Sequence, residues 1–151
     1  MHAVRILFAY VSGGRDMHRV PEYRSHHYSL RVPFADIDLG GVVYHAHYLR
    51  YFDQARMEWY RAKGVDLAEM MSVQRRGLIV CGIETEFMSP AGHDELLTIH
   101  TTLEEFTGVR LAFRQDVYRE DRLIARGRTK LAGVSMDTLR PARIPFSFAL
   151  E

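Results

Sequence analysis

The sequence predicts an α+β domain in which a curved antiparallel sheet of about five strands wraps around one long helix. Three observations lead to this fold class. A helical apolar stripe runs through residues 48–62, four strand-like segments follow residue 77, and strands and helices do not alternate as a parallel sheet requires. A chain of 151 residues is long enough for one such domain with a full core.

The domain organisation is expected to be simple. Residues 1–24 are predicted to be a flexible N-terminal extension and residues 25–151 the folded domain. A Ser-Gly-Gly run ends the first apolar segment after Val11, and the residues that follow are polar without a period. That apolar segment is short and contains Arg5, which argues against a secretory signal. Met17 is a second candidate for the natural start.

The first element expected is a strand over residues 27–36, followed by the long helix. Pro33 cannot donate a ladder hydrogen bond, so this strand should lie at a sheet edge or end in a bulge. The apolar positions of the helix fall at spacings of four and three: Tyr48, Phe52, Ala55, Trp59 and Ala62. Its other side is expected to carry the polar residues Arg50, Asp53, Gln54, Arg56, Glu58 and Arg61. Gly64 should end it, and a short second helix is predicted over residues 66–75.

Four strands should complete the sheet. In the first, five alternate residues are expected to share a face: Ile79, Cys81, Ile83, Thr85 and Phe87. The second and third alternate over residues 97–103 and 109–117, with turns at 107–108 and 120–121. The fourth, over residues 123–136, should present Arg122, Arg126, Arg128 and Lys130 on one face. A sheet curled over a single helix leaves exposed edges, so we expect a homodimer or homotetramer that covers them.

Composition excludes several classes of protein. With 47% hydrophobic and 26% charged residues the chain should fold, and a net charge of +1 favours neither nucleic acid nor a membrane surface as partner. The single cysteine, Cys81, rules out an internal disulfide and Cys-rich zinc sites and suits the cytoplasm. No apolar run reaches the roughly 18 residues of a membrane span, so no stable membrane insertion is expected.

Residues 36–48 concentrate the chemistry of the chain directly ahead of the long helix. Asp38 can activate water or attack a carbonyl directly, and Gly40 and Gly41 let the backbone approach a ligand closely. The helix that follows offers free N–H groups and the positive end of its dipole to an oxyanion. Asp36 can act here too, although a turn or N-cap role is favoured for it.

The pattern Asp36-x-Asp38-x-x-Gly41-Val-Val-Tyr-His45-x-x-Tyr48 is followed by Arg-x-Glu-Trp at residues 56–59. It resembles the hotdog-fold acyl-CoA thioesterases, in particular the 4-hydroxybenzoyl-CoA thioesterase-like group, which includes the bacterial thioesterases associated with the Tol-Pal system. The resemblance is strongest over residues 28–62 and extends less specifically, through Ser-Pro-Ala at 89–91 and Glu-Leu at 95–96, to about residue 136. Residues 1–24 fall outside it.

This resemblance implies hydrolysis of an acyl-CoA or acyl-carrier-protein thioester without a cofactor or metal. It implies that Asp38 is the catalytic carboxylate and that the backbone amide of His45 stabilises the oxyanion. The neighbouring Gly41, Val43 and Tyr44 are expected to contact substrate. His47 departs from the small amide common at its position in the family, so the role of that amide is left open here.

Alternatives accompany several of these residues. The histidines at 45 and 47 could bind metal, but a His-x-His at a helix start does not place both rings on one face. Glu58 could face a partner's site, although a surface pair with Arg61 is favoured. Tyr48, Phe52 and Trp59 are expected in the core rather than in an acyl pocket.

Two roles are possible for the basic residues of the last strand. Arg126 and Arg128 are candidate ligands of the coenzyme A phosphates, because guanidinium groups match phosphate geometry. A solvated strand face is the competing interpretation. Aromatic residues do not alternate with these cations, which argues against a nucleic-acid site.

Two other functions compete with thioester hydrolysis. A hydroxyacyl-thioester dehydratase would be organised around a histidine with a proline-rich loop, and no such loop follows His45 or His47. A non-catalytic module could bind acyl-CoA or acyl-carrier protein. A buried or half-buried carboxylate at Asp38 would argue against simple binding.

Overall fold

The computed structural model describes residues 24–146. The expected extension therefore lies outside the described residues except for Arg24, as do the candidate start at Met17 and the last five positions of the chain.

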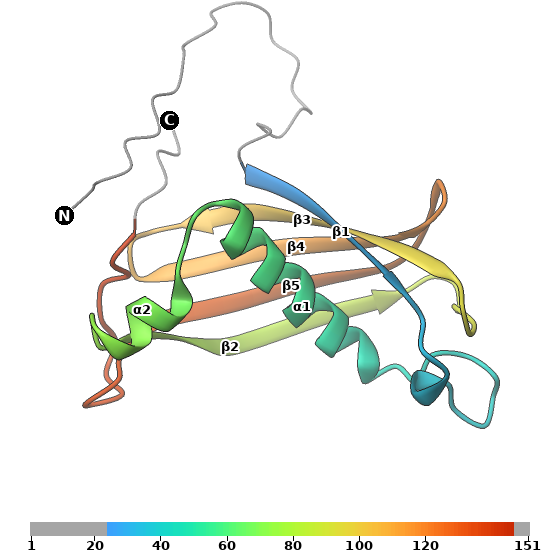
Figure 1. Cartoon of the computed structure of the whole chain (residues 1–151), viewed down its shortest axis with the longest axis horizontal. Helices are drawn as coiled ribbons and strands as arrows, with labels where there is room; N and C mark the ends of the chain where they lie inside the picture. The colour runs from blue at the N-terminus through green and yellow to red at the C-terminus, as the bar shows by residue number, and fades with distance from the viewer. Residues whose placement is uncertain (1–23, 147–151) are drawn as a thin grey trace, which may run out of the picture.

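One five-stranded antiparallel sheet and one long helix make up the described domain (Figure 1). The strands are β1 (Ser25–Arg31), β2 (Arg76–Phe87), β3 (Leu96–Phe106), β4 (Arg110–Arg119) and β5 (Arg122–Ser135). They follow the order β1-β3-β4-β5-β2, which leaves β1 and β2 at the edges. The predicted fold class, a curved sheet around a long helix, is confirmed.

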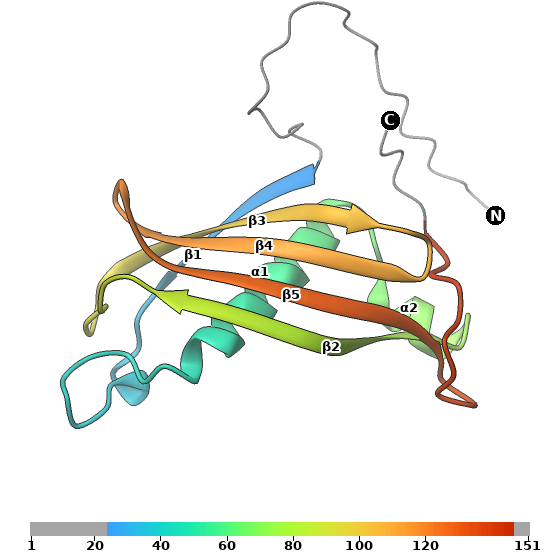
Figure 2. The same ribbon diagram turned by 180° about the vertical axis from the view of Figure 1, so that it is seen from behind.

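Helix α1 (His47–Ala62) lies against one face of the sheet, and the view from behind shows the opposite face uncovered by helices (Figures 1 and 2). The predicted stripe is buried from Tyr48 to Trp59, since Tyr48, Phe52 and Trp59 are at most 3% exposed. Its last predicted member, Ala62, is exposed at the end of the helix. These three residues belong to the core, as expected. The helix ends before Gly64, whose φ of 70° is the left-handed conformation that glycine adopts freely.

Arg56 corrects the prediction for the polar side of α1, because its side chain is only 3% exposed. It lies four residues after Phe52 and three before Trp59, so helical geometry puts it on the stripe that faces the sheet. Its guanidinium donates to Gln115 at 3.0 Å and to Thr129 at 3.2 Å. The expected surface pair between Glu58 and Arg61 is present.

The core consists of two apolar clusters with polar side chains between them. The first includes Tyr48, Tyr51, Phe52, Ala55, Leu97, Ile99, Val117, Ile124 and Ala125. The second includes Trp59, Tyr60, Leu103, Leu111, Phe113, Leu131 and Ile144. On β3 and β4 the buried residues between the clusters are Thr101 and Gln115, and on α1 the residue is Arg56. The long helix is thus fixed to the sheet by hydrogen bonds as well as by apolar contact.

Several element boundaries differ from the prediction. Strand β1 ends at Arg31, before Pro33, and Phe34–Asp36 form a turn of 3₁₀ helix. β1 is an edge strand, as Pro33 indicated. Helix α2 (Leu67–Ser72) is shorter than expected. It begins one residue later because Asp66 is its N-cap, accepting a hydrogen bond from the N–H of Glu69, and it ends at Ser72 instead of residue 75.

Two irregularities break the predicted alternation. In β2 the register with β5 shifts between Val80 and Gly82, so no β5 residue stands opposite Cys81 in the strand register. The alternate residues therefore do not keep one face throughout the strand. In β5, Leu123 pairs with Tyr118 and Ala125 with Val117, which leaves Ile124 as an extra residue. Arg122 is therefore out of phase with Arg126, Arg128 and Lys130, contrary to the prediction of one continuous basic face.

Candidate active site

The loop between η2 (Phe34–Asp36) and α1 is closed by backbone hydrogen bonds at its base. Tyr44 donates to the carbonyl of Asp36 at 2.9 Å, and Ile37 forms an antiparallel bridge with Val43. Val43 also donates to the carbonyl of Ala91 at 2.9 Å, which ties the loop to the segment ahead of β3. We call residues 36–44 the active-site loop.

Asp38 begins the tight turn at the tip of this loop. Its carbonyl accepts from Gly41 at 3.0 Å, and its carboxylate oxygen Oδ1 accepts from the N–H of Gly40 at 2.7 Å. A Cβ on Gly40 would lie 3.0 Å from Oδ1, and Gly41 has a φ of 76°. Gly41 therefore suits the left-handed backbone of the turn, and Gly40 leaves space beside the carboxylate.

The Asp38 side chain is exposed in the protomer. A buried or half-buried carboxylate, which would have argued against a simple binding module, is therefore not found at this position in the single chain. The physical reason is the position of Asp38 at the loop tip, where the adjacent Leu39 is also fully exposed. A carboxylate in this position can reach a ligand or a second chain without any rearrangement of the core.

Asp36 occupies the opposite environment, with only 3% of its surface exposed. Its Oδ2 accepts hydrogen bonds from the guanidinium of Arg50 and, at 2.5 Å, from the hydroxyl of Tyr51. His47 places Nδ1 3.7 Å from Oδ1. Burial and the bond to Asp36 both raise the pKa of the Tyr51 hydroxyl, which stays protonated as a donor. The structure thus gives Asp36 a turn and anchoring role and not that of an N-cap, since Ala46 is the N-cap of α1.

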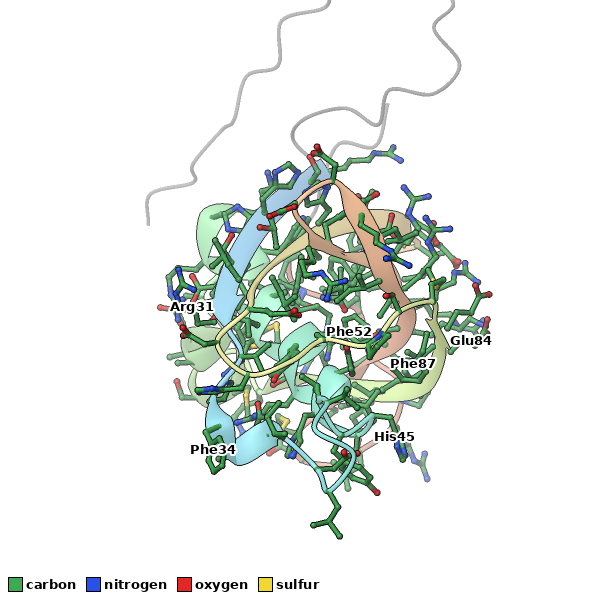
Figure 3. All side chains as sticks on the ribbon, turned by 90° about the vertical axis from the view of Figure 1, so that its right-hand side faces the viewer. Arg31, Phe34, His45, Phe52, Glu84 and Phe87 are labelled. Atoms are coloured by element: carbon green, nitrogen blue, oxygen red, sulfur yellow. The ribbon has the colours of Figure 1, made fainter. Side chains whose placement is uncertain are left out.

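The start of α1 presents backbone donors beside the loop. Within residues 24–146, the N–H group of His45 has no hydrogen-bond acceptor, whereas that of His47 donates to Tyr44 at 2.9 Å. The ring of His45 packs against Tyr44, with centroids 4.4 Å apart, and faces Phe87 at 6.5 Å (Figure 3). A free N–H at a helix N-terminus is suited to stabilise negative charge.

The predicted substrate contacts divide into two groups. Gly41 and Tyr44 are exposed on the active-site loop, where a ligand can reach them. The side chain of Val43 is buried in the first core cluster, so only the backbone of this residue is left to contact a ligand. The structure thus brings Asp38, Gly41, Tyr44 and the amide of His45 together at one end of α1.

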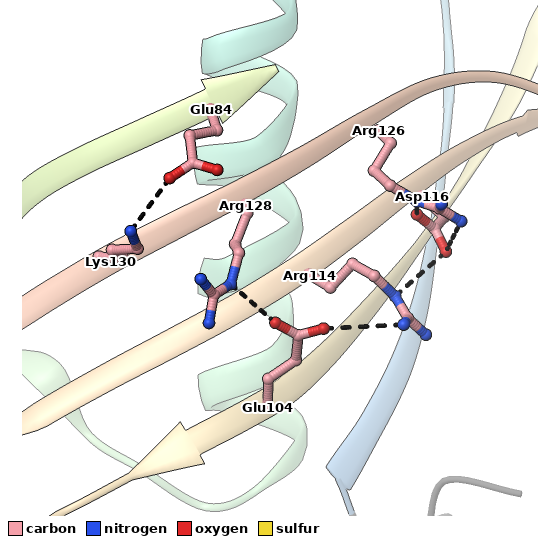
Figure 4. A network of polar contacts seen from close by, with 7 residues as sticks. All are labelled: Glu84, Glu104, Arg114, Asp116, Arg126, Arg128 and Lys130. Atoms are coloured by element: carbon pink, nitrogen blue, oxygen red, sulfur yellow. Dashed lines mark hydrogen bonds and ion pairs between the residues drawn. The ribbon is translucent and has the colours of Figure 1, made fainter. Parts of the chain in front are cut away.

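Arg126 and Arg128 lie elsewhere, on the face of the sheet that turns away from α1 (Figure 4). Arg126 makes a two-pronged contact with Asp116, at 2.5 and 3.2 Å, and this bond raises the pKa of the guanidinium. Arg128 donates to Glu104 at 2.9 Å. Together with Glu84–Lys130 and with Arg114, which bridges Glu104 and Asp116, they form a charge network across β2 to β5. A phosphate would have to compete with these carboxylates for the two arginines. Neither Arg126 nor Arg128 is next to the active-site loop in the sequence, and the charge network contains no residue of that loop.

Sequence reasoning missed the residues that support the loop. Arg50 and Tyr51 bind Asp36, and Arg119 binds Glu95 at 2.9 Å in the segment that holds Val43. Burial of Glu95 works against ionisation, but the N–H of Gly92 and the Arg119 guanidinium lower its pKa overall. The spacing of these pairs follows no secondary-structure period. Charge could have pointed to Arg50 and Arg119, but nothing in the sequence pointed to Tyr51.

Two further findings concern the described residues only. No group of three or more His, Cys, Asp and Glu side chains within residues 24–146 is arranged to hold a metal ion. Over the same range, no helix combines the length and the apolar character that crossing a bilayer requires.

A carboxylate-bearing loop that leads into a long helix, wrapped by a curved antiparallel sheet, defines a hotdog-fold thioesterase. The chain belongs to the thioesterase-like superfamily, whose model matches residues 32–150. The predicted family is thereby confirmed.

Named relatives agree with this assignment. The chain is 30% identical to an acyl-CoA thioesterase YbgC of Haemophilus influenzae over 118 residues, which are 78% of this chain and 87% of the relative. It is 30% identical to the acyl-CoA thioester hydrolase YbgC of Escherichia coli O6:H1, over 81% of this chain and 91% of that protein.

Solved structures share the fold. A probable thioesterase from Bartonella henselae superimposes with a TM-score of 0.76 at 31% identity, covering 80% of this chain and 99% of the other. A variant of 4-hydroxybenzoyl CoA thioesterase in complex with 4-hydroxybenzoyl CoA gives a TM-score of 0.73 at 23% identity, covering 80% and 91%, and shows the likeness of fold alone.

Proposed function

We propose that this chain hydrolyses acyl-CoA thioesters to the free acid and coenzyme A, with Asp38 as general base or nucleophile. One observation carries this assignment: Asp38 stands exposed on a glycine-stabilised turn, and the backbone N–H of His45, two residues before the first residue of α1, has no acceptor among residues 24–146. A carboxylate and an oxyanion donor on one short segment are the two groups that thioester hydrolysis requires.

The reaction follows from these two groups. Asp38 takes a proton from water while the water oxygen attacks the thioester carbonyl carbon, or its carboxylate attacks that carbon directly. The amide of His45 donates to the carbonyl oxygen as negative charge develops there. The carbon–sulfur bond then breaks, and the coenzyme A thiolate leaves and takes up a proton. After water attack that proton is the one held by Asp38, passed on directly or through solvent. After direct attack the acyl group is left on Asp38 as a mixed anhydride, which a water molecule hydrolyses to the free acid and the regenerated carboxylate. Gly41 and Tyr44 border the path of the acyl group.

The test is a free-thiol assay over a panel of acyl-CoA substrates. Asp38→Asn should leave a folded protein whose kcat is lower by about 10²–10⁴-fold, the usual contribution of a general base. Asp66→Asn makes the same chemical change at the cap of α2, where asparagine caps equally well, and should keep full activity. Wild-type turnover in Asp38→Asn would overturn the proposal. Hydration or dehydration without thiol release would indicate a dehydratase, and binding without turnover a carrier module.

The proposal includes a homodimer or homotetramer in the cytoplasm that acts on coenzyme A or acyl-carrier-protein thioesters. Support for assembly comes from β2, a 12-residue edge strand. Its exposed apolar residues are Ile79, Val80, Ile83 and Phe87, followed by Met88. A long apolar edge is a template for pairing with another chain. A second copy paired there would also flank Phe87, which neighbours His45, and would help to cover the exposed site.

Cys81 provides a direct test of this assembly, because it is the single cysteine of the chain and lies exposed near the middle of β2. Two β2 strands that pair antiparallel around their midpoint bring the two thiols close together. A short bifunctional maleimide should therefore produce a covalent dimer, and Cys81→Ser should abolish it. Light scattering that shows a monomer would contradict the assembly without bearing on the chemistry of Asp38.

A further inference from the structure

The buried carboxylate of Asp36 has no part in the reaction described above, yet three side chains converge on it. Tyr51 donates at 2.5 Å, Arg50 donates as well, and His47 lies 3.7 Å away. All three come from the first two turns of α1. A buried carboxylate is costly unless it is paired, so this cluster is a built structure that attaches Asp36 to the helix.

Asp36 is also the base of the active-site loop. Its carbonyl accepts from Tyr44 at the far end of the loop, and two residues further along the chain Asp38 pairs with Val42 through its N–H at 2.9 Å. Asp38, two residues along the chain, and His45, which follows Tyr44, are therefore both close to one anchored residue. Whatever holds Asp36 against α1 also sets the position of the reacting carboxylate relative to the oxyanion donor.

We propose that Asp36, Arg50 and Tyr51 are positioning residues that hold Asp38 in register with the amide of His45. This inference rests on the proposed function for its effect on turnover, but not for its effect on the loop. This positioning matters for the rate, because displacement of a reacting group by about 1 Å can lower the rate on the order of 10²-fold.

His47 makes the weakest of the three contacts with the Asp36 carboxylate. The distance of 3.7 Å between Nδ1 and the Asp36 carboxylate exceeds a hydrogen bond, so the attraction depends on the charge of the ring. Arg50 is a permanent cation on the same carboxylate and Tyr51 a neutral donor. His47 should therefore add less to loop order than Tyr51, and His47→Asn should have the smaller effect.

The experiment measures backbone amide exchange of the active-site loop without substrate, beside kcat and KM. Tyr51→Phe removes one hydroxyl and keeps the ring. The matched control is Tyr60→Phe, also buried on α1, whose hydroxyl has no hydrogen-bond partner among residues 24–146. Tyr51→Phe should accelerate exchange at Asp38 and Tyr44 and lower kcat about tenfold with little change in KM. Tyr60→Phe should leave all of these unchanged.

Each outcome decides the inference. Unchanged exchange at Asp38 and Tyr44 in Tyr51→Phe overturns it, whatever the activity. Accelerated exchange confined to the loop supports it, even if Asp38→Asn later proves fully active and the proposed function fails. If Tyr51→Phe loses protection throughout α1, Arg50→Gln, a change at a half-exposed side chain, replaces it under the same criteria.

Discussion

Gln115 offers a quantitative test of how α1 is fixed to the sheet. It is fully buried, and its side chain makes three hydrogen bonds: it accepts from Arg56 at 3.0 Å and donates to the carbonyl of Phe52 at 2.7 Å and to Thr101 at 3.2 Å. Burial lowers the pKa of Arg56, although Asp53 acts against this shift, so the guanidinium depends on such partners.

The cost of Gln115→Leu follows from these contacts. One hydrogen bond to a charged group contributes about 1.5–3 kcal/mol and each neutral one about 0.5–1.5 kcal/mol, while the leucine recovers part of this through apolar burial. We expect a loss of about 3 kcal/mol in the free energy of unfolding. In an Arg56→Met background the same change should cost about 1.5 kcal/mol less, because no buried charge is left without its acceptor.

Urea unfolding at one fixed protein concentration measures these energies, since assembly makes stability depend on concentration. Gln54→Leu is the matched control, because Gln54 is exposed on the same helix and should change stability by no more than about 0.5 kcal/mol. If the two changes at positions 56 and 115 were additive within about 0.5 kcal/mol, the polar layer would not act as a coupled unit.

Two further changes probe packing and pH. In Gly127→Ala the new Cβ would lie 2.6 Å from the Phe52 ring, so we expect a loss of about 1–3 kcal/mol in thermal unfolding, and an unchanged melting temperature would refute this close contact. Burial and the neighbouring His27 lower the pKa of His100, although Asp116 opposes the shift. The unfolded chain therefore binds a proton more readily at this site, and stability should fall as the pH drops below the ordinary histidine value of about 6.5. His100→Gln should flatten this decline in an unfolding series across pH, and an equally steep decline would exclude His100 as its source.

The sequence alone predicted the class of fold, and it indicated the segment that is proposed as the site. In β3 and β4 the alternate apolar residues Leu97, Ile99, Phe113 and Val117 are fully buried as the pattern indicates, because one face of the sheet packs on the helix. The alternation is not strict, since β3 has a register shift between Leu103 and Glu105. The turn around Asp38 could be predicted from the sequence for a similar reason. Gly41 is favoured there by its positive φ and Gly40 by the space it leaves beside the Asp38 carboxylate, and both depend on neighbouring residues and not on distant ones.

The tertiary structure decided which charged residues are buried and which partners they have. Arg56 lies in the core because Gln115 and Thr129 meet it there, and Asp36 is paired with Tyr51 because the active-site loop folds back on α1. The bulges in β2 and β5 likewise arise from pairing between strands far apart in sequence.

The physical reason is the range of the interactions. Periodicity and turn chemistry act over a few residues and can be read along the chain. Compensation of a buried charge, as at Asp36, and the register of two strands, as between β2 and β5, depend on which segments meet in space. The sequence therefore located Asp38 and the helix behind it, and the fold alone determined what holds them in place.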